Sequence, residues 1–227
     1  VCRLLDVDLV RGWNIDPPYT WGKTGHFKIA ARACELVKNS NLSALLMANQ
    51  KNIGYVDDDL VGGDVTSGKF THDFVPLADV ADIIWRTTRK TDESNHFSDV
   101  DESDSGVFGG KSLLELSLHD DANIAIPKWL EFDRQMDLVN PILQVNPDTG
   151  KESLRPRDGA LPFRVWQMYR QMILSLQEGK VDEFICAGGT MAHYVGDACQ
   201  PLHISFLHHG RDPSEAAVHA DYETHLV

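Results

Sequence analysis

The sequence is poor in basic residues: 21 Lys and Arg stand against 34 Asp and Glu, which gives a formal net charge of −13 at pH 7. Nucleic acids and anionic lipid surfaces are polyanions, so an acidic chain does not bind them tightly through its overall charge. The composition therefore argues against a stable nucleic-acid complex. A phosphodiester can still bind locally where bound cations reverse the sign of a site.

Long apolar runs are also missing. No stretch approaches the roughly 20 residues that a membrane-spanning helix needs, so no transmembrane segment is expected. Residues 1–20 carry Arg3, Asp6, Asp8 and Arg11 where an export signal would have its apolar part, so they do not form an intact signal. We interpret residues 1–20 as an N-terminal extension and residues 21–227 as one domain.

Cysteines are few: Cys2, Cys34, Cys186 and Cys199. None forms a Cys-x-x-Cys pair, which argues against a thiolate zinc site. Four cysteines neither require nor exclude one disulfide or two.

Strand-like alternation is absent as well, and helical periodicity takes its place, so the predicted class is all-α. Helices are expected over residues 29–37, 165–176 and 181–199 and, more briefly, over Asp79–Trp85, with stops at Gly179 and Pro201. Loops are expected over residues 52–69, 87–110 and 140–162. The acidic run from Asp99 to Asp104 lacks the glycine and final glutamate of an EF-hand, so it is interpreted as a solvated loop. The predicted buried positions of the first two helices are Ile29, Ala30, Ala33, Leu36, Val37, Val165, Tyr169, Met172, Ile173 and Leu176.

What the sequence has in plenty is histidine, ten in all. His193 and Asp197 stand four residues apart and therefore project from one helix face about 40° apart, a geometry suited to metal ligands. His203 follows just beyond Pro201, where a bent chain can direct it at the same site. The simpler alternative is a solvated helix whose histidine and aspartate form a surface pair.

A second pair, His219 and Glu223, repeats the spacing near the C-terminal end. Such a pair alone is more often a surface ion pair, and His26 and His96 alone would more often be structural. The recurrence of imidazole and carboxylate groups is the mixture that zinc accepts, and it favours a metal site.

The order of these motifs resembles the ligand series of the zinc-dependent phospholipase C and S1/P1 nuclease superfamily. It runs Trp-Gly-x-x-Gly-His from Trp21, Ala-Asp at Asp82, His-Phe-x-Asp from His96, His-Tyr-x-Gly-Asp-x-x-Gln-Pro-x-His from His193, and His-x-x-x-Glu from His219. The resemblance implies an all-α domain with up to three zinc ions in a cleft between helices. It also implies a secreted or extracytoplasmic protein.

Carried over residue by residue, the resemblance implies three ligand sets. The first is His96, His193, Asp197 and Asp82, the second is His203, His219 and Glu223, and the third is His26, Asp197 and the main chain of Trp21. Asp82 is also the implied catalytic residue, which orients or deprotonates a water. Asp79, one helical turn earlier, is the alternative carboxylate.

The chain departs from the family pattern in three places. Trp21 is the mature N-terminus in the family and ligates a metal through its free amine, whereas here residues 1–20 precede it, so we expect the third site to need their removal. The family continues beyond the position of Glu223, so the domain is expected to be C-terminally incomplete. The positions of the family's head-group pocket hold Thr24, Ile83 and Glu93, which do not form an aromatic cage for a quaternary ammonium.

The predicted function is hydrolysis of phosphodiesters by a zinc-bound hydroxide, as in phospholipase C acting on phospholipid head groups with transient membrane-surface contact. The alternatives are a single-strand nuclease or 3′-nucleotidase of S1/P1 type and a non-catalytic zinc-stabilised binding protein. An HD-type phosphohydrolase would use His72 and Asp73, or His119 with Asp120 and Asp121, but it leaves the motif from His193 to His203 without a role.

Overall fold

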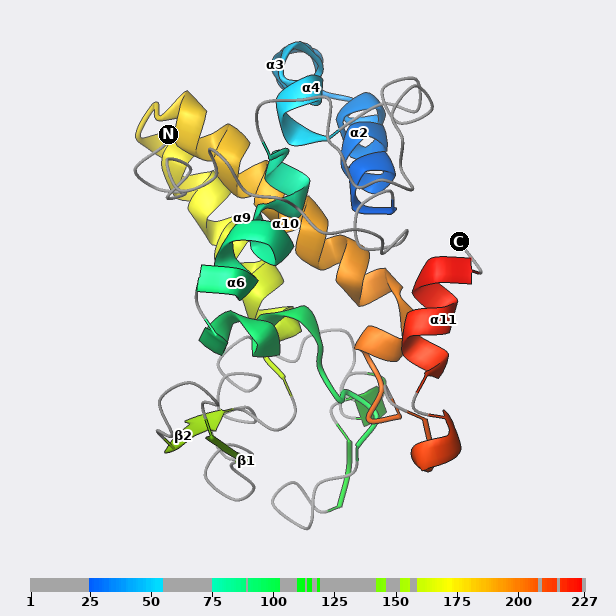
Figure 1. The fold of residues 1–227 in the computed structure, drawn as a ribbon. Coiled ribbons are helices and arrows are strands. Elements are labelled where there is room, and N and C mark those ends of the chain that lie inside the picture. Colours follow the sequence, from blue (N-terminus) through cyan, green and yellow to red (C-terminus); the bar gives the residue numbers. More distant parts are fainter. Residues whose placement is uncertain are drawn as a thin grey trace.

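The computed structural model describes residues 25–54, 75–88, 90–102, 110–112, 114–115, 118, 142–145, 152–155, 159–207, 210–215 and 217–225. Helices dominate these residues, which confirms the all-α class (Figure 1). In chain order they are His26–Leu36 (α2), Ser40–Ala48 (α3), Gln50–Ile53 (α4), Leu77–Asp79 (η3), Ala81–Trp85 (η4), Arg86–Thr88 (α6), Lys90–His96 (η5), Leu161–Gln177 (α9), Val181–Cys199 (α10), Pro201–His203 (η6), Pro213–Glu215 (η7) and Val218–His225 (α11).

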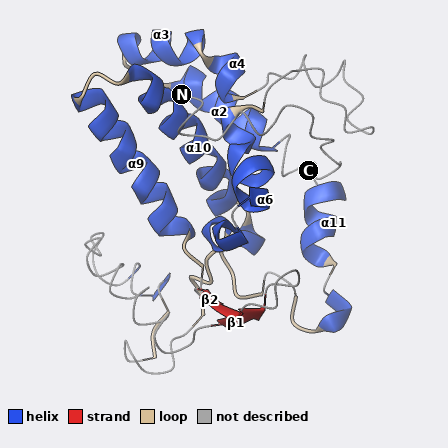
Figure 2. Ribbon diagram, turned by 60° about the vertical axis from the view of Figure 1, so that its left-hand side comes forward, coloured by secondary structure: helices blue, strands red, loops and turns tan. Residues whose placement is uncertain are grey.

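Two of the expected loops are in part wrong. Residues 86–88 form α6 and residues 90–96 form η5, and residues 140–162 contain a hairpin in which Ile142–Val145 (β1) pairs antiparallel with Glu152–Arg155 (β2). The hairpin lies apart from the helical body (Figure 2). Strands this short are missed because they hold too few alternating positions for a period of two to show.

Helix α10 is the centre of the helical body. Helices α9 and α2 and the turn η3 all pack against it, and α9 lies alongside it in both views (Figures 1 and 2). Gly189 explains the close approach of η3, because a Cβ atom at this position would lie 2.4 Å from Leu77 Cβ. The glycine that weakens the helical pattern of the sequence is therefore a packing residue.

The two predicted buried faces are only partly correct. In α2 the buried residues are His26, Phe27, Ala30, Ala31 and Cys34, so of the predicted positions Ala30 alone is buried. In α9, Val165 and Met172 pack against the core, whereas Tyr169, Ile173 and Leu176 are exposed. In both helices, apolar residues lie on two adjacent faces. The periodicity shows that such a face exists, but it does not show which of the two packs against another helix.

Candidate metal centre

Helix α10 contributes two neighbouring side chains to the site. His193 and Asp197 are both almost fully buried, and His193 Nε2 lies 3.3 Å from Asp197 Oδ2, as their spacing of four residues predicts. The alternative of a solvated surface pair is therefore wrong. The turn η6 follows directly, because Pro201 cannot continue the α10 hydrogen bonds, and it places His203 beside the same helix end.

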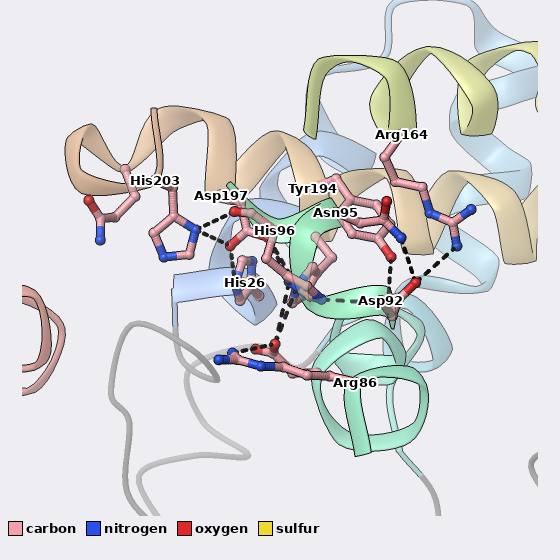
Figure 3. Close-up of polar contacts among 12 residues, drawn as sticks. His26, Arg86, Asp92, Asn95, His96, Arg164, Tyr194, Asp197 and His203 are labelled. Atoms are coloured by element: carbon pink, nitrogen blue, oxygen red, sulfur yellow. Dashed lines mark hydrogen bonds and ion pairs between the residues drawn. The ribbon is translucent and has the colours of Figure 1, made fainter. Parts of the chain in front are cut away.

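Asp197 is the centre of the site. Its Oδ1 lies 3.3 Å from His26 Nε2 and 3.2 Å from His203 Nδ1. Its Oδ2 lies 3.1 Å from His96 Nδ1 and 3.3 Å from His193 Nε2. One carboxylate thus faces four imidazoles, which come from α2, η5, α10 and η6 (Figure 3). The two oxygens divide these rings into two pairs.

Among the described residues the site contains three groups of potential metal ligands, each with its ligand atoms within 4.8 Å of one another. We call them the Asp197 group, the Asp82 group and the Glu223 group. Their members are, in that order, His26, His193 and Asp197; Asp82, His96 and His193; and His203, His219 and Glu223. His193 belongs to the first two groups, so these form one continuous cluster.

The Asp82 group settles which early carboxylate faces the histidines. Asp82 Oδ1 lies 3.5 Å from His96 Nδ1 and 3.9 Å from His193 Nε2, whereas Asp79 is fully buried and belongs to none of the three groups. Asp82 is about a quarter exposed, and its other neighbour is Arg86, with Nη1 3.6 Å from Oδ1. It is therefore the ligand of this group that is open to solvent.

The Glu223 group joins η6 to α11. His203 Nε2 lies 3.0 Å from both His219 Nε2 and Glu223 Oε1, and His219 Nε2 lies 2.9 Å from Glu223 Oε1. Gln200 donates a hydrogen bond of 3.1 Å from Nε2 to Glu223 Oε1. The fully buried amide of Gln200 thus holds the carboxylate against the two rings.

Backbone carbonyls orient two of the imidazoles. His193 Nδ1 lies 2.7 Å from the carbonyl oxygen of Ala78, and His203 Nδ1 lies 2.7 Å from that of His96. Since a carbonyl only accepts hydrogen bonds, each Nδ1 is the donor. Nε2 of His193 then faces Asp197 and His96, and Nε2 of His203 faces the Glu223 group, while Nδ1 of His203 lies near both the carbonyl oxygen and Asp197 Oδ1. A short-range pattern in the sequence does not contain these partners, which lie about a hundred residues away.

Asp101 fixes the loop that carries these contacts. Its carboxylate accepts hydrogen bonds from Ser205 Oγ at 2.7 Å and from the backbone N–H of Phe206 at 2.9 Å. Asp99 is buried, so the prediction of a solvated acidic loop is wrong for both residues. The hydrogen bonds of Asp101 thus hold the segment after His96 against the segment after His203.

The charges of the cluster shift the pKa values of its members. Burial would lower the pKa of His96, but Asp82, Asp197 and Asp92 outweigh it and raise the pKa to about 9. Burial would likewise lower the pKa of His203, but Asp197 and Glu223 raise it to about 10. Burial would raise the pKa of Asp197, yet the surrounding histidines hold it well below its usual range. In the cluster, protonated histidines thus stabilise the anionic carboxylates. Bound metal cations would stabilise the same carboxylates in the same way.

His26 behaves differently from these histidines. Burial and the stacked ring of His193, whose centroid is 3.8 Å away, lower the pKa of His26. His26 therefore presents a neutral Nε2 to Asp197, the form that a metal ion requires of an imidazole.

Several predicted residues cannot be placed in the site. Trp21, Thr24, His72, Asp73 and residues 1–20 and 119–121 lie outside the described residues. Ile83 is buried in the hydrophobic core. Glu93 lies within η5, and its side chain is outside the described part of the structure.

Four further residues surround His96 and were not predicted: Asp92, Asn95, Arg164 and Tyr194. Asp92 precedes His96 by four residues, the same spacing that relates His193 to Asp197 and His219 to Glu223. The signal for Asp92 was therefore present in the sequence.

A probable serine protease of Bradyrhizobium tropiciagri is similar to this chain, with 31% identity over an alignment of 270 residues. The alignment covers all of the chain but 34% of the relative, so the chain spans about a third of the relative's length. No protein-family model and no solved structure matches the chain. This comparison contradicts the predicted phosphodiester hydrolysis, both as phospholipase C and as nuclease, because a protease hydrolyses peptide bonds.

Among the described residues, no helix is long and apolar enough to cross a membrane.

Proposed function

We propose that this chain is the zinc-binding helical part of a metal-dependent hydrolase that acts on peptide or ester bonds. The observation that carries the proposal is Asp197, a buried carboxylate that faces four imidazoles at 3.1 to 3.3 Å. A carboxylate shared between metal ions brings the ligands of both ions around itself.

The distances between ligand atoms fit zinc. Two ligands at about 2.0–2.1 Å from a tetrahedral zinc ion lie about 3.3 Å from each other. The ring nitrogens of His96 and His193 are 3.1 Å apart, and the contacts within the Glu223 group are 2.9 to 3.0 Å. His193 donates its Nδ1–H to a carbonyl, so in the neutral ring Nε2 faces His96 with a lone pair that a cation can occupy. The residues present therefore fit two or three zinc ions.

Bound zinc would supply Lewis-acid chemistry, lowering the pKa of a water and polarising the bond to be cleaved. The side chains have their own tasks. Burial would raise the pKa of Asp82, but His193 and His96 outweigh it and keep this pKa below the usual range. A carboxylate of low pKa is a weak base. Asp82 thus accepts a hydrogen bond from the attacking water and orients it, and Arg86 holds Asp82 in place from the solvent side.

The choice of peptide substrates follows the name of the relative, and the choice of metal follows the site. The ligand order resembles that of the zinc-dependent phospholipase C and S1/P1 nuclease superfamily, and membership of that superfamily remains part of this proposal. So does an extracytoplasmic location. A serine protease mechanism would instead need a serine activated by one histidine that one carboxylate orients, whereas the carboxylate of Asp197 is shared by four imidazoles.

The test is to measure zinc per chain and the hydrolysis of labelled casein and of a nitrophenyl ester by the whole chain. Activity is expected to be lost on chelation, to return with added zinc, and to withstand a serine-directed phosphonate. Asp197→Asn is expected to lose both zinc and activity. Asp212→Asn, which changes an exposed carboxylate beside η7, serves as the matched control and is expected to keep both.

Three results would overturn the proposal. The first is a chain that binds no zinc, and the second is a zinc-loaded chain that cleaves neither substrate. The third is activity that survives chelation but is lost to the phosphonate, which would assign the chain a serine mechanism instead.

A further inference from the structure

His96 presents a different ring nitrogen to the site from two of its neighbours. His193 and His203 donate Nδ1–H to backbone carbonyls and present Nε2 to the ligand groups. In His96, Nδ1 faces inward, 3.1 Å from Asp197 Oδ2 and 3.1 Å from His193 Nε2. The ring of His96 is therefore turned the other way round, and its Nε2 points out of the site.

The outward Nε2 of His96 faces the carboxylate of Asp92. The distance from Nε2 to Asp92 Oδ2 is 3.6 Å, an ion-pair contact somewhat longer than a hydrogen bond (Figure 3). Within the described part of the chain this buried Nε2 has no hydrogen-bond partner. An unsatisfied buried donor is destabilising, so a small movement of the ring toward Asp92 is favourable.

Asp92 itself is firmly held. It is buried and accepts hydrogen bonds from Asn95 Nδ2 at 2.6 Å and from the hydroxyl of Tyr194 at 3.3 Å. Arg164 approaches it with Nη2 3.9 Å from Oδ1. The guanidinium of Arg164 in turn lies 4.9 Å from the ring centroid of Trp85 and 5.3 Å from that of Tyr194. Figure 3 shows this network on the side of His96 away from Asp197.

We propose that Asp92 is a positioning residue that accepts the Nε2–H of His96 and so makes Nδ1 the metal-binding nitrogen of this ring. The inference rests on the proposed metal binding. A histidine that ligates a metal commonly donates its other N–H to a carboxylate or carbonyl, which fixes the tautomer and makes the ligating nitrogen more basic. Asp92 performs for His96 what the carbonyl oxygens of Ala78 and His96 perform for His193 and His203.

The test uses the whole chain loaded with zinc and labelled with ¹⁵N in histidine. Long-range ¹H–¹⁵N correlation spectra distinguish an imidazole bound through Nδ1 from one bound through Nε2. His96 is expected to give the Nδ1-bound signature, and His193 and His203 the Nε2-bound one. In Asp92→Leu the Nδ1-bound signature is expected to disappear, and zinc affinity at the Asp82 group, measured by competition with a chelator, to fall about 10- to 100-fold.

Two further variants separate positioning from a merely structural role. Asp92→Asn keeps an oxygen that can accept the Nε2–H, so it is expected to retain the signature and to rescue part of the affinity. Tyr194→Phe removes a hydroxyl that supports Asp92 but leaves the carboxylate beside His96. It is expected to lower the stability of the metal-free chain while leaving the signature and the affinity of the wild type.

The outcomes distinguish the two proposals. If the wild-type chain binds no zinc, the proposed function fails. If it binds zinc and Asp92→Leu keeps both the Nδ1-bound signature and the wild-type affinity, metal binding stands and the role of Asp92 is wrong. An Nε2-bound His96 in the zinc-loaded wild type would likewise overturn the role of Asp92.

Discussion

The substitution Gly196→Ala tests the packing of the metal centre without changing any ligand. Gly196 lies on α10 one residue before Asp197, and a Cβ atom added there would lie 2.6 Å from His26 Nδ1 and 3.1 Å from His26 Cε1. Carbon atoms in contact normally lie about 3.5–4.0 Å from their neighbours. The ring of His26 would therefore have to move by about 1 Å, and it is fully buried and stacked on His193.

The same helix offers a matched control, Gly188→Ala. A Cβ atom at Gly188 would meet only Met172, with Cε at 3.3 Å, and the end of a methionine side chain moves easily. Both substitutions gain about 0.5–1 kcal/mol of helix propensity. Gly196→Ala alone forces an extra group into a packed site, which costs about 1–3 kcal/mol. The free energy of unfolding of Gly196→Ala is thus expected to be lower than that of Gly188→Ala by about 1–3 kcal/mol.

The assay is urea unfolding of both metal-free variants, followed by measurement of zinc per chain after reloading. Gly188→Ala is expected to bind as much zinc as the wild type. Gly196→Ala is expected to bind less, because a displaced His26 no longer meets Asp197. Equal unfolding midpoints and equal zinc contents in the two variants would show that His26 does not occupy the position on which this reasoning depends.

Three other expectations concern charge and protons. Asp197→Asn leaves the surrounding imidazoles without their shared carboxylate, so the metal-free chain is expected to lose about 3–5 kcal/mol of stability, and a loss under 1 kcal/mol in urea unfolding would contradict the role of Asp197. In the metal-free chain the pKa values of His96 and His203, about 9 and 10, lie above the value of about 6.5 expected when unfolded, so their stabilisation is complete below pH 6.5 and is lost as the pH rises through 9 and 10. Zinc binds deprotonated imidazole, so the stabilisation by excess zinc is expected to increase between pH 6.5 and 8.5, and thermal unfolding with and without zinc should show opposite trends. For the same reason zinc binding at pH 7 is expected to release protons, which calorimetry in buffers of different ionisation enthalpy measures; no release would mean that these rings are already neutral.

Much of the helical body was predictable from local pattern. The helices around residues 165–176 and 181–199 and their stops depend on the spacing of apolar residues and on Gly179 and Pro201, which are properties of the chain itself. The faces that the helices bury were predicted less well. Leu36 belongs to the expected buried stripe of α2 but is 60% exposed, because the helix buries the neighbouring stripe with Phe27 and Cys34.

The site divides in the same way. The spacing of four residues is a local property of a helix, so His193 with Asp197 and His219 with Glu223 could be paired from their positions in the sequence alone. The choice between Asp79 and Asp82 could not be made locally. Both lie in short helical turns three residues apart. Only the packing of η3 against α10 and of η4 against η3 and η5 turns Asp82 toward His96 and His193 and buries Asp79 elsewhere.

The sequence by itself determined the helical class and the kind of atoms available for a metal, because both depend on residue type and on spacing within a helix. Only the tertiary structure decided that four imidazoles from α2, η5, α10 and η6 meet at one carboxylate. It also decided which nitrogen of each ring faces inward, since the Ala78 carbonyl, the His96 carbonyl and Asp92 lie on segments distant in sequence or on another turn. Orientation of a ring depends on where its second nitrogen finds a partner, and that partner is supplied by the packing of the chain as a whole.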